Sequence, residues 1–583
     1  MTDTEHLPGP GGRTARPGGP DGRSAHLQGP DTEHLPGPGG RTARPGGPDG
    51  RSAHLPGPDT AHLPEADGPT DVLTALLETA RRRGDAPALT GPDGTTYGHR
   101  QLADAVRATA RGLREAGMAP GERVLFSVRP GPEGVVLALG IIAAGATVVF
   151  VDPGAGPELF AARRELAAPR WAAAESLLYA ASRYGRPLAR RRGLLLPQYH
   201  RLGLRHIRAG RWLPGVPSGA LSAKGLAAGP AGSFHPTPAP DQEALVVFTS
   251  GTTSAPRAVV HTRGSLGAGL ARCGHALRMG DGDTVHTDQL MMGVPALITG
   301  ARWTMPPYGF APAADPVRYA AGLGGATHTF CVPADLPAVL DAVERGEATV
   351  PPSLRYVVLG GAPVLPGLLR RAARVMPSVR FLAVYGMTEI LPVAVATGEE
   401  KLAHPGPGDL LGTPLPSVGL RTAPDGELLV SGPHLCRGYL GGPAMDEHAT
   451  GDLARLEDGR LVLHGRKKDM LIRGRTNIYP GLYEPAITAL PGVAEAVIVG
   501  VPDEYGDERV VLALVAEHPP ASPDAFAESV RGLLPSVIDA AVLPDDVVVL
   551  DRIPVAGRSR KPDREALRAR LRPAAASGTG AAR

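Results

Sequence analysis

The chain has 583 residues, of which 42% are hydrophobic, 20% charged and 4% aromatic, and its formal net charge is +3. This length allows a large core and more than one domain, whereas the balanced charge and the few aromatic side chains argue against nucleic-acid binding. The cysteines, Cys273, Cys331 and Cys436, are far apart and lack metal-ligand spacing, which fits a reducing, cytoplasmic compartment. Neither a run of eighteen apolar residues nor an apolar N-terminal segment occurs, so we expect no transmembrane helix and no signal peptide.

The chain begins with a repeat. Residues 3–30 recur almost unchanged at 31–58, and a third copy begins at Asp59. The repeat is rich in proline, glycine and charge and contains too few apolar residues to bury a face. We therefore expect residues 1–68 to be a disordered tail without a catalytic part, and residues 573–583 to be a second disordered tail.

Alternating helical and strand patterns follow from Asp71 onward. The spacing of apolar residues predicts a helix over 72–83 and another over 96–117. The apolar runs at 123–128 and 135–151 are of strand and helix type. This alternation predicts an α/β fold with largely parallel sheets.

Residues 183–211 contain nine arginines, and no acidic residue occurs between Glu175 and Asp241. We interpret this segment as a solvated, helix-rich insertion. A membrane surface or an acidic partner is the alternative contact for it. Nucleic acid is the least favoured partner, because no recognition motif accompanies the arginines.

A short apolar strand pattern at 244–248 leads into a loop that reads Thr-Ser-Gly-Thr-Thr-Ser-Ala-Pro-Arg-Ala-Val at 249–259. Closely spaced backbone N–H groups and hydroxyls in such a loop can bind a polyphosphate. A loop rich in Ser, Thr and Gly is also typical of a plain turn. It is not a Walker A loop, because G-x-x-x-x-G-K-[ST] does not occur.

Four further segments follow it in order. Residues 356–363 read Tyr-Val-Val-Leu-Gly-Gly-Ala-Pro, and residues 384–389 read Val-Tyr-Gly-Met-Thr-Glu. Thr-Gly-Asp at 450–452 precedes Gly-Arg-Lys-Lys-Asp at 465–469. The last segment ends in Gly-Arg-Ser-Arg-Lys-Pro-Asp-Arg at 557–564.

Together the five segments resemble the adenylate-forming superfamily of acyl-CoA synthetases, adenylation domains and luciferases, over residues 71–568. The resemblance implies activation of a small-molecule carboxylic acid by ATP and Mg²⁺ to acyl-AMP and pyrophosphate, and then transfer to a thiol of CoA or of a carrier-protein phosphopantetheine. It also implies a large N-terminal domain with parallel-rich sheets over 69–467 and a small, mobile α+β lid domain over 468–572. No covalent enzyme nucleophile is needed, because the substrate carboxylate attacks phosphorus.

The resemblance assigns the nucleotide site residue by residue. The phosphates would be bound by Thr249, Ser250, Gly251, Thr252, Thr253 and Arg257. Adenine would lie along Gly360, Gly361, Ala362 and Pro363, with Tyr385 stacked on it and Gly386 in the same turn. Asp452 would hold the ribose diol and Arg466 would contact ribose.

The same resemblance implies the catalytic groups. Thr388 would contact the α-phosphate, Glu389 would help to hold Mg²⁺, and Lys468 would be the hinge. Lys561 would neutralise charge as pyrophosphate leaves. Its neighbours Arg558 and Arg560 are competitors, but Asp563 and Arg564 place Lys561 in the register of the family motif, Gly-Lys-x-Asp-Arg.

Four departures from the family pattern keep alternatives open. Ser254, Arg257 and Ala258 replace Gly, Lys and Gly in the phosphate loop, and Arg475 replaces a glycine beside the pantetheine tunnel. Details near 150–156, 211–212 and 388–394 resemble the β-lactone synthetases of bacterial olefin biosynthesis, which use no CoA. A catalytically impaired, nucleotide-binding scaffold is the third interpretation.

A methionine pair stands where many acyl-CoA synthetases carry an aromatic-His pair on the acyl pocket wall. Met291 and Met292 suit a long, flexible apolar ligand, although core filling is the commoner role of methionine.

Overall fold

The computed structural model describes residues 71–154, 157–191, 196–232, 234–249, 257–307, 309–473, 476–502, 508–538, 542–556 and 560–571. Both predicted tails therefore lie outside the described residues. So do several positions named above: Ser250, Gly251, Thr252, Thr253, Ser254, Arg475 and Arg558.

One sheet has eight described strands, and its central neighbours are parallel. In sheet order they are β19 (Gly438–Tyr439), β9 (Arg257–Thr262), β8 (Glu243–Thr249), β4 (Thr147–Phe150), β3 (Arg123–Ser127), β5 (Trp171–Glu175), β6 (Arg205–Ala209) and β7 (Leu221–Ser222). The antiparallel pairs, β8 with β9 and β9 with β19, stand at one edge. β3 and β4 are almost continuously apolar and buried, as expected for parallel strands covered on both faces.

A second sheet has thirteen described strands. In order they are β17 (Gly419–Thr422), β18 (Glu427–Ser431), β20 (His448–Glu457), β21 (Arg460–Arg466), β16 (Asp409–Pro414), β15 (Ile390–Thr397), β14 (Arg380–Met387), β13 (Tyr356–Gly360), β12 (His328–Cys331), β10 (Thr284–His286), β11 (Arg302–Thr304), β1 (Pro87–Thr90) and β2 (Thr96–Gly98). The run from β11 to β14 is parallel, and pairing becomes antiparallel from β14 onward.

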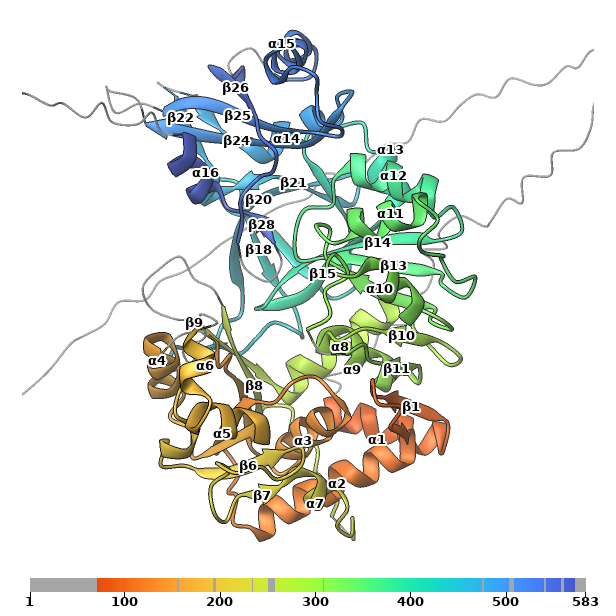
Figure 1. Cartoon of the computed structure of the whole chain (residues 1–583), viewed down its shortest axis with the longest axis vertical. Coiled ribbons are helices and arrows are strands. Elements are labelled where there is room, and N and C mark those ends of the chain that lie inside the picture. Colours follow the sequence, from red (N-terminus) through yellow and green to blue (C-terminus); the bar gives the residue numbers. More distant parts are fainter. Residues whose placement is uncertain are drawn as a thin grey trace, which may run out of the picture. The chain divides into compact units, whose positions relative to one another are not determined.

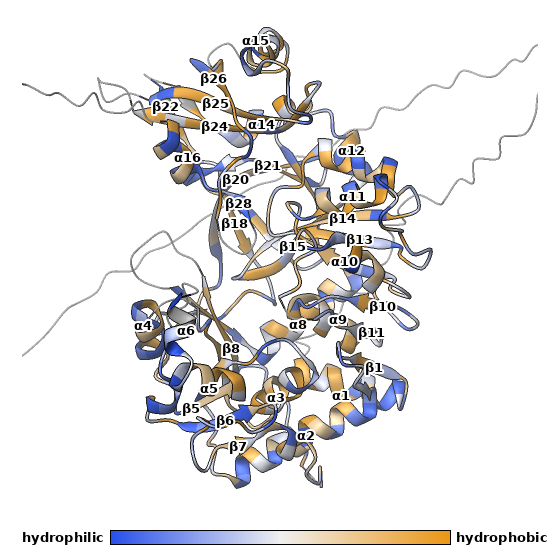
Figure 2. Cartoon of the chain, in the orientation of Figure 1, coloured by the Kyte–Doolittle hydropathy of each residue, from blue (hydrophilic) through white to orange (hydrophobic). Residues whose placement is uncertain are grey.

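Six helices pack with these sheets around the largest apolar core. They are α1 (Val72–Arg83), α2 (His99–Glu115), α3 (Pro132–Ala143), α7 (Ala223–Ala227), α8 (Arg263–Ala276) and α9 (Leu290–Thr299). Asp71 caps α1 through its carboxylate, which also forms a buried ion pair with Arg263 at 2.7 Å. The start of the folded chain is thereby joined to α8. The helix α1 packs against α8 and α9 (Figure 1). Figure 2 shows hydrophobic residues along β8 and α8.

The remaining helices of the two sheets lie nearer the surface. They are α4 (Pro157–Ala167), α5 (Ser176–Arg183), α6 (Arg186–Arg191), η1 (Tyr199–Arg201), α10 (Pro316–Gly322), α11 (Leu336–Glu344), α12 (Pro366–Val375) and α13 (Gly398–Ala403). Among the described residues, no helix has both the length and the apolar character needed to cross a bilayer.

The C-terminal part has its own small sheet and its own apolar clusters. Its elements are η2 (Lys467–Asp469), β22 (Leu471–Arg473), β23 (Thr476–Ile478), α14 (Pro480–Thr488), β24 (Val493–Pro502), β25 (Glu508–Ala516), α15 (Pro523–Leu533), η3 (Leu534–Ser536), β26 (Asp546–Val549), β27 (Val555–Ala556), β28 (Lys561–Pro562) and α16 (Arg564–Leu571). Successive residues of β25, such as Leu512 and Ala513, belong to two different apolar clusters, because successive side chains of a strand point to opposite faces.

The predicted α/β class, with a large N-terminal part and a small C-terminal domain, is confirmed. The helix predicted over 72–83 is α1. The helix predicted over 96–117 is wrong at its start, because Thr96–Gly98 pairs with β1 as strand β2 and the helix begins at His99. The run at 135–151 divides into α3 and β4 at Gly145, whose φ of +88° requires a left-handed turn.

The arginine-rich segment, residues 183–211, is not wholly the solvated insertion that its composition predicts. Its last part, β6, is a strand of the eight-stranded sheet and pairs in parallel with β5. Arg205 lies over the ring of Trp171, with its guanidinium carbon 4.0 Å from the ring centroid. Trp212, just beyond this strand, is exposed. Part of the segment is therefore structural.

Candidate functional site

Most of the predicted site residues that the structure describes meet at one cavity of about 3100 Å³. Those lining it are Thr249, Gly361, Ala362, Pro363, Tyr385, Gly386, Thr388, Asp452, Arg466, Lys468 and Lys561. Three others do not line it: Gly360 is buried at the end of β13, Glu389 is 9% exposed, and Arg257 begins β9. Segments distributed from residue 249 to residue 561 are thus brought together.

The best-defined part of the cavity wall surrounds Asp452. This residue lies in β20 directly opposite Arg466 of β21. Its carboxylate accepts a hydrogen bond from Arg466 Nε at 2.7 Å and one from the hydroxyl of Tyr385 at 2.8 Å. Asp452 is only 2% exposed, so this charge depends on its partners.

The ionisation of these partners reflects the same contacts. Burial and the Asp452 carboxylate raise the pKa of Tyr385. Burial by itself lowers the pKa of Arg466, but Asp452, together with Asp469 and Tyr385, offsets this and the net shift is upward. Tyr385 and Arg466 thus both direct donors at the Asp452 carboxylate, an acceptor that is suited to a pair of hydroxyl donors.

The second part is the turn Thr388-Glu389 between β14 and β15. His261 of β9 donates its Nε2 proton to the Thr388 carbonyl at 2.7 Å. The backbone N–H of Cys436 donates to the Glu389 carbonyl at 2.7 Å. The turn is therefore held on two sides. Burial lowers the pKa of His261, which favours the neutral imidazole that this geometry uses.

Tyr439 is a residue of this site that sequence reasoning missed. Its hydroxyl donates to Glu389 Oε1 at 2.9 Å, and the guanidinium carbon of Arg257 lies 5.7 Å from its ring centroid. Burial and Glu389 raise the pKa of Tyr439 to about 12, so the hydroxyl stays protonated. The available signal was weak, because it consisted of one tyrosine in Cys-Arg-Gly-Tyr-Leu at 436–440. Arg257, Tyr439 and Glu389 are thus in consecutive contact.

Glycine is required beside this tyrosine. Gly438 has a φ of +144°, and a Cβ added there would lie 2.4 Å from the carbonyl oxygen of Pro443. The backbone can therefore pass between β9 and Pro443 only without a side chain at this position.

Lys561 comes from β28, where it pairs with Ala556 of β27. Its pKa is lowered, first by burial and then by the cations Arg466 and Lys468, with Asp452 opposing the shift. Its amine thus lies in the field of the Asp452 cluster. Arg560, the described competitor, is paired instead with Asp335 at 2.8 Å.

Arg564 anchors the segment that follows. Its guanidinium contacts both oxygens of Glu484 in α14, each at 2.8 Å, and donates to the carbonyl of Ile498 at 2.8 Å. This bidentate pair fixes the start of α16 against the small sheet.

The donor set fits a nucleotide-bound cation better than a protein-held one. In the described part of the chain, no group of three or more His, Cys, Asp or Glu side chains could hold a metal ion. Magnesium is commonly bound by one or two carboxylates together with substrate phosphates. Glu389 can supply such a carboxylate.

The cavity continues into the N-terminal core between α3, α8, α9, β4 and β8. This extension is lined by aliphatic and methionine side chains: Val135, Ala138, Leu139, Ile142, Leu245, Leu266, Leu270, Leu290, Met291 and Val294. Met291 lines it, whereas Met292 is buried in the core cluster. The side chains named here suit an apolar group, and Asp288 and Gln289, just before Leu290, also line the cavity.

Comparison with known proteins agrees with this geometry. The sequence model of the AMP-binding enzyme family matches residues 76–440, and that of the AMP-binding enzyme C-terminal domain matches residues 483–561.

Curated relatives match over most of the chain. It is 29% identical to a salicylyl-CoA synthase / salicylate adenylyltransferase of a Streptomyces species, over 82% of this chain and 90% of that protein. It is 28% identical to the olefin beta-lactone synthetase of Stenotrophomonas maltophilia, over 79% and 91%. The match to the isonitrile lipopeptide synthase of Streptomyces coeruleorubidus is 28% identical and covers 85% of this chain, but the chain spans only 33% of that protein.

Among solved structures, the amide bond synthetase McbA from Marinactinospora thermotolerans superposes with a TM-score of 0.68 over 86% of this chain and all of that one. The identity is 24%, so this similarity concerns the fold. With the family match covering more than half of its length, the chain belongs to the AMP-binding enzyme family and is an adenylate-forming ligase that activates a carboxylic acid.

Proposed function

We propose that the chain activates a fatty or other apolar acyl acid with ATP to give acyl-AMP and pyrophosphate, and then transfers the acyl group to a CoA or carrier-protein thiol. The observation that carries this proposal is the continuity of one cavity. It joins the Asp452 cluster and Lys561 to an extension lined by aliphatic residues and methionine. An aromatic acid with polar substituents would find few partners there.

In this proposal each residue of the cavity has one role. Asp452 and Arg466 hold the ribose, Gly361 with its neighbours lies along adenine, and Thr388 contacts the α-phosphate. When Mg²⁺ is bound beside Glu389, it offsets charge on the phosphates. The ammonium of Lys561 lies beside the α-phosphate and neutralises its negative charge. It does so as the carboxylate oxygen bonds to phosphorus and the bond to pyrophosphate breaks.

The phosphate loop and the hinge complete the proposal. Backbone N–H groups of residues 249–253, with Arg257, bind the β- and γ-phosphates. Lys468 begins the lid domain, which would rotate between the two half-reactions. The acyl acceptor in this proposal is the thiol of CoA or of a carrier protein. The salicylyl-CoA synthase relative supports CoA.

Two wider expectations stay predictions. Cytoplasmic location rests on the cysteine content. Peripheral contact of residues 183–211 with a membrane or an acidic partner rests on their arginines and on exposed Tyr184 and Trp212.

A β-lactone synthetase is the second candidate. The relative from Stenotrophomonas maltophilia supports it, as do the sequence details at 388–394 and Arg475. In this reaction the β-hydroxyl of the acyl-AMP would attack its own carbonyl carbon and release AMP, so no thiol would be needed.

Acid-dependent ATP–pyrophosphate exchange tests the first half-reaction. The panel should contain acetate, octanoate, myristate, 3-hydroxymyristate, salicylate and indoleacetate. We expect exchange to be strongest with the longer aliphatic acids. Preferred exchange with salicylate would reject the apolar assignment, and no exchange with any acid would favour a nucleotide-binding scaffold.

The acceptor is tested separately with 3-hydroxymyristate. Product formation should require CoA or a carrier protein if the chain is an acid–thiol ligase. Formation of a β-lactone without a thiol would reject the ligase assignment and establish the second candidate.

A further inference from the structure

Arg560, immediately before Lys561, has an unusual backbone and a distant partner. Its φ is +48°, in the left-handed region that β-carbon contacts disfavour. The family motif places glycine here, which has no such restriction. The Arg560 side chain instead crosses to the N-terminal part, where Nη1 lies 2.8 Å from Asp335 Oδ1. Residues in strained conformations persist where their surroundings hold them.

Asp335 is well placed to receive this cation. Its side chain is 11% exposed, against 44% for Arg560, and it is the N-cap residue of α11. Its carboxylate makes no hydrogen bond to the first turn of this helix, so it is available to Arg560. Among the described residues, Arg560 is the cation that pairs with it. The N-terminal end of a helix dipole attracts negative charge at this position.

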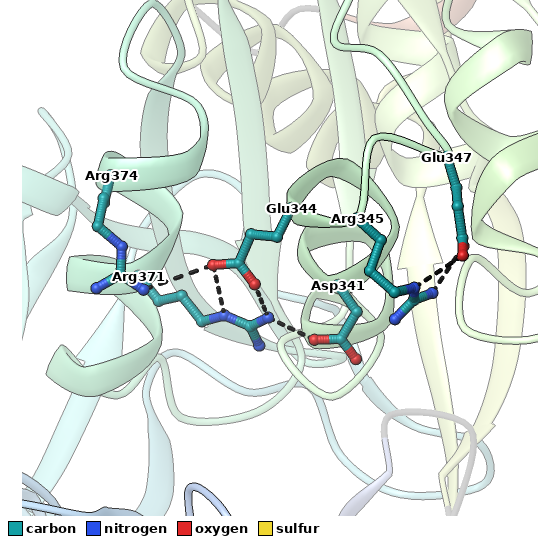
Figure 3. Close-up of polar contacts among 6 residues, drawn as sticks. All are labelled: Asp341, Glu344, Arg345, Glu347, Arg371 and Arg374. Atoms are coloured by element: carbon teal, nitrogen blue, oxygen red, sulfur yellow. Dashed lines mark hydrogen bonds and ion pairs between the residues drawn. The ribbon is translucent and has the colours of Figure 1, made fainter.

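The helix that carries Asp335 is itself firmly held. Arg371 of α12 bonds to both Asp341 and Glu344 on α11, and Arg374 reaches Glu344 at 3.5 Å (Figure 3). Arg345 pairs with Glu347 just beyond the helix, at 2.8 Å (Figure 3). Asp335 thus begins a helix whose C-terminal half is joined to α12 by ion pairs.

On its C-terminal side Lys561 is positioned by Asp563, whose N–H donates to the Pro554 carbonyl at 2.8 Å, and by the Arg564–Glu484 pair. On its N-terminal side the described side-chain contact is that of Arg560 with Asp335. The hairpin β27–β28 has two paired positions, Val555 with Pro562 and Ala556 with Lys561. So short a hairpin is weak by itself. A contact at residue 560 restricts the backbone of its neighbour directly.

We infer that the Arg560–Asp335 ion pair is a latch that holds Lys561 at the reacting phosphate for adenylation and opens when the lid moves for acyl transfer. Arg560 is then a positioning residue, which acts through Lys561. The inference rests on the proposed role of Lys561. The departure from glycine in the family motif thus exchanges backbone freedom for a charged contact with the N-terminal part of the chain.

The latch is tested by ATP–pyrophosphate exchange in Arg560→Gly, Asp335→Asn and the double variant. Arg560→Gly also suits the left-handed backbone, so the chain should fold. We expect each single variant to lower the kcat of exchange by about fivefold to tenfold, with the KM for ATP unchanged. The double variant should be no slower than either single one, because both remove the same contact.

A matched control is Arg509→Gln. It removes an ion pair to Asp546 at 3.2 Å that lies wholly within the C-terminal part, and its arginine is 43% exposed, against 44% for Arg560. This control should exchange at the wild-type rate.

Unchanged exchange in the single variants, or multiplied losses in the double variant, would overturn the latch. A loss of thermal stability equal in all variants, with KM and kcat falling together, would also overturn it. Lys561→Ala distinguishes a failure of the proposed role of Lys561 from a failure of the latch. If it retains full exchange, the proposed role of Lys561 fails. If it loses exchange while Arg560→Gly does not, only the latch fails.

Discussion

Replacing Asp452 by Asn tests the ribose assignment most directly. The amide keeps the shape of the carboxylate but removes its charge. Two bonds are affected, those from Arg466 at 2.7 Å and from Tyr385 at 2.8 Å. In a nucleotide complex, the carboxylate would accept from the ribose diol instead of from the tyrosine hydroxyl. Hydrogen bonds to charged groups contribute about 1.5–3 kcal/mol, against about 0.5–1.5 kcal/mol for neutral ones. The expected loss is about 1–3 kcal/mol, because the site is almost fully buried.

This loss corresponds to a rise of roughly 5- to 150-fold in the KM for ATP. The kcat of exchange should change little, because the ribose is remote from the reacting phosphorus. The assay is ATP–pyrophosphate exchange at varied ATP with saturating acid. Tyr385→Phe is the matched control, since it removes one donor and leaves the charge, and its KM should rise far less. An unchanged KM in Asp452→Asn would refute the ribose assignment. A lowered kcat at saturating ATP would instead place Asp452 near the reacting atoms.

Three further predictions concern Lys561, the acyl extension and a buried histidine. Because the pKa of Lys561 is lowered and the ammonium is the active form, exchange should fall with rising pH earlier than for an ordinary lysine. In Lys561→Arg this alkaline limb should move upward, and an unmoved limb would reject the assignment. Ala138→Trp should block the extension, so that myristate exchange falls at least tenfold while acetate exchange persists; equal losses for both acids would contradict the location of the acyl chain. Burial lowers the pKa of His434 to about 4, so the folded state resists protonation and the free energy of unfolding should decline as pH falls from about 6.5 toward 4. In His434→Gln that decline should be shallower by up to about 1.4 kcal/mol per pH unit in urea titrations, and an identical slope would refute the contribution of this histidine.

The sequence was most informative where its signals were local. The apolar spacing of residues 72–83 predicted α1 to the residue, because an amphipathic helix repeats its pattern within each turn. The start of α2 was wrong because Thr96 and Tyr97 pair with β1, and this pairing depends on tertiary structure rather than helical spacing. The strand β6 was not predicted, because its arginines suggested a solvated segment and its pairing with β5 depends on tertiary structure.

The site residues likewise include some that lie in local motifs and some that depend on tertiary contacts. Asp452, Glu389 and Lys561 stand in recognisable motifs, so the sequence could name them. His261 and Tyr439 could not be named, because each acts on a residue far along the chain: His261 on Thr388 and Tyr439 on Glu389. Their roles come from the pairing of β9 with β19 and of β14 with β15.

The pairing of β9 with β19 also has a consequence for biosynthesis. Val260 follows the phosphate loop closely in sequence, yet its partner Gly438 is synthesised much later. Contacts between such distant segments form only after both have left the ribosome, and they slow folding. Until then Glu389 lacks the Tyr439 hydroxyl, and the edge of β9 is unpaired. An N-terminal fragment ending before β19 should therefore expose a strand edge that invites association with other chains.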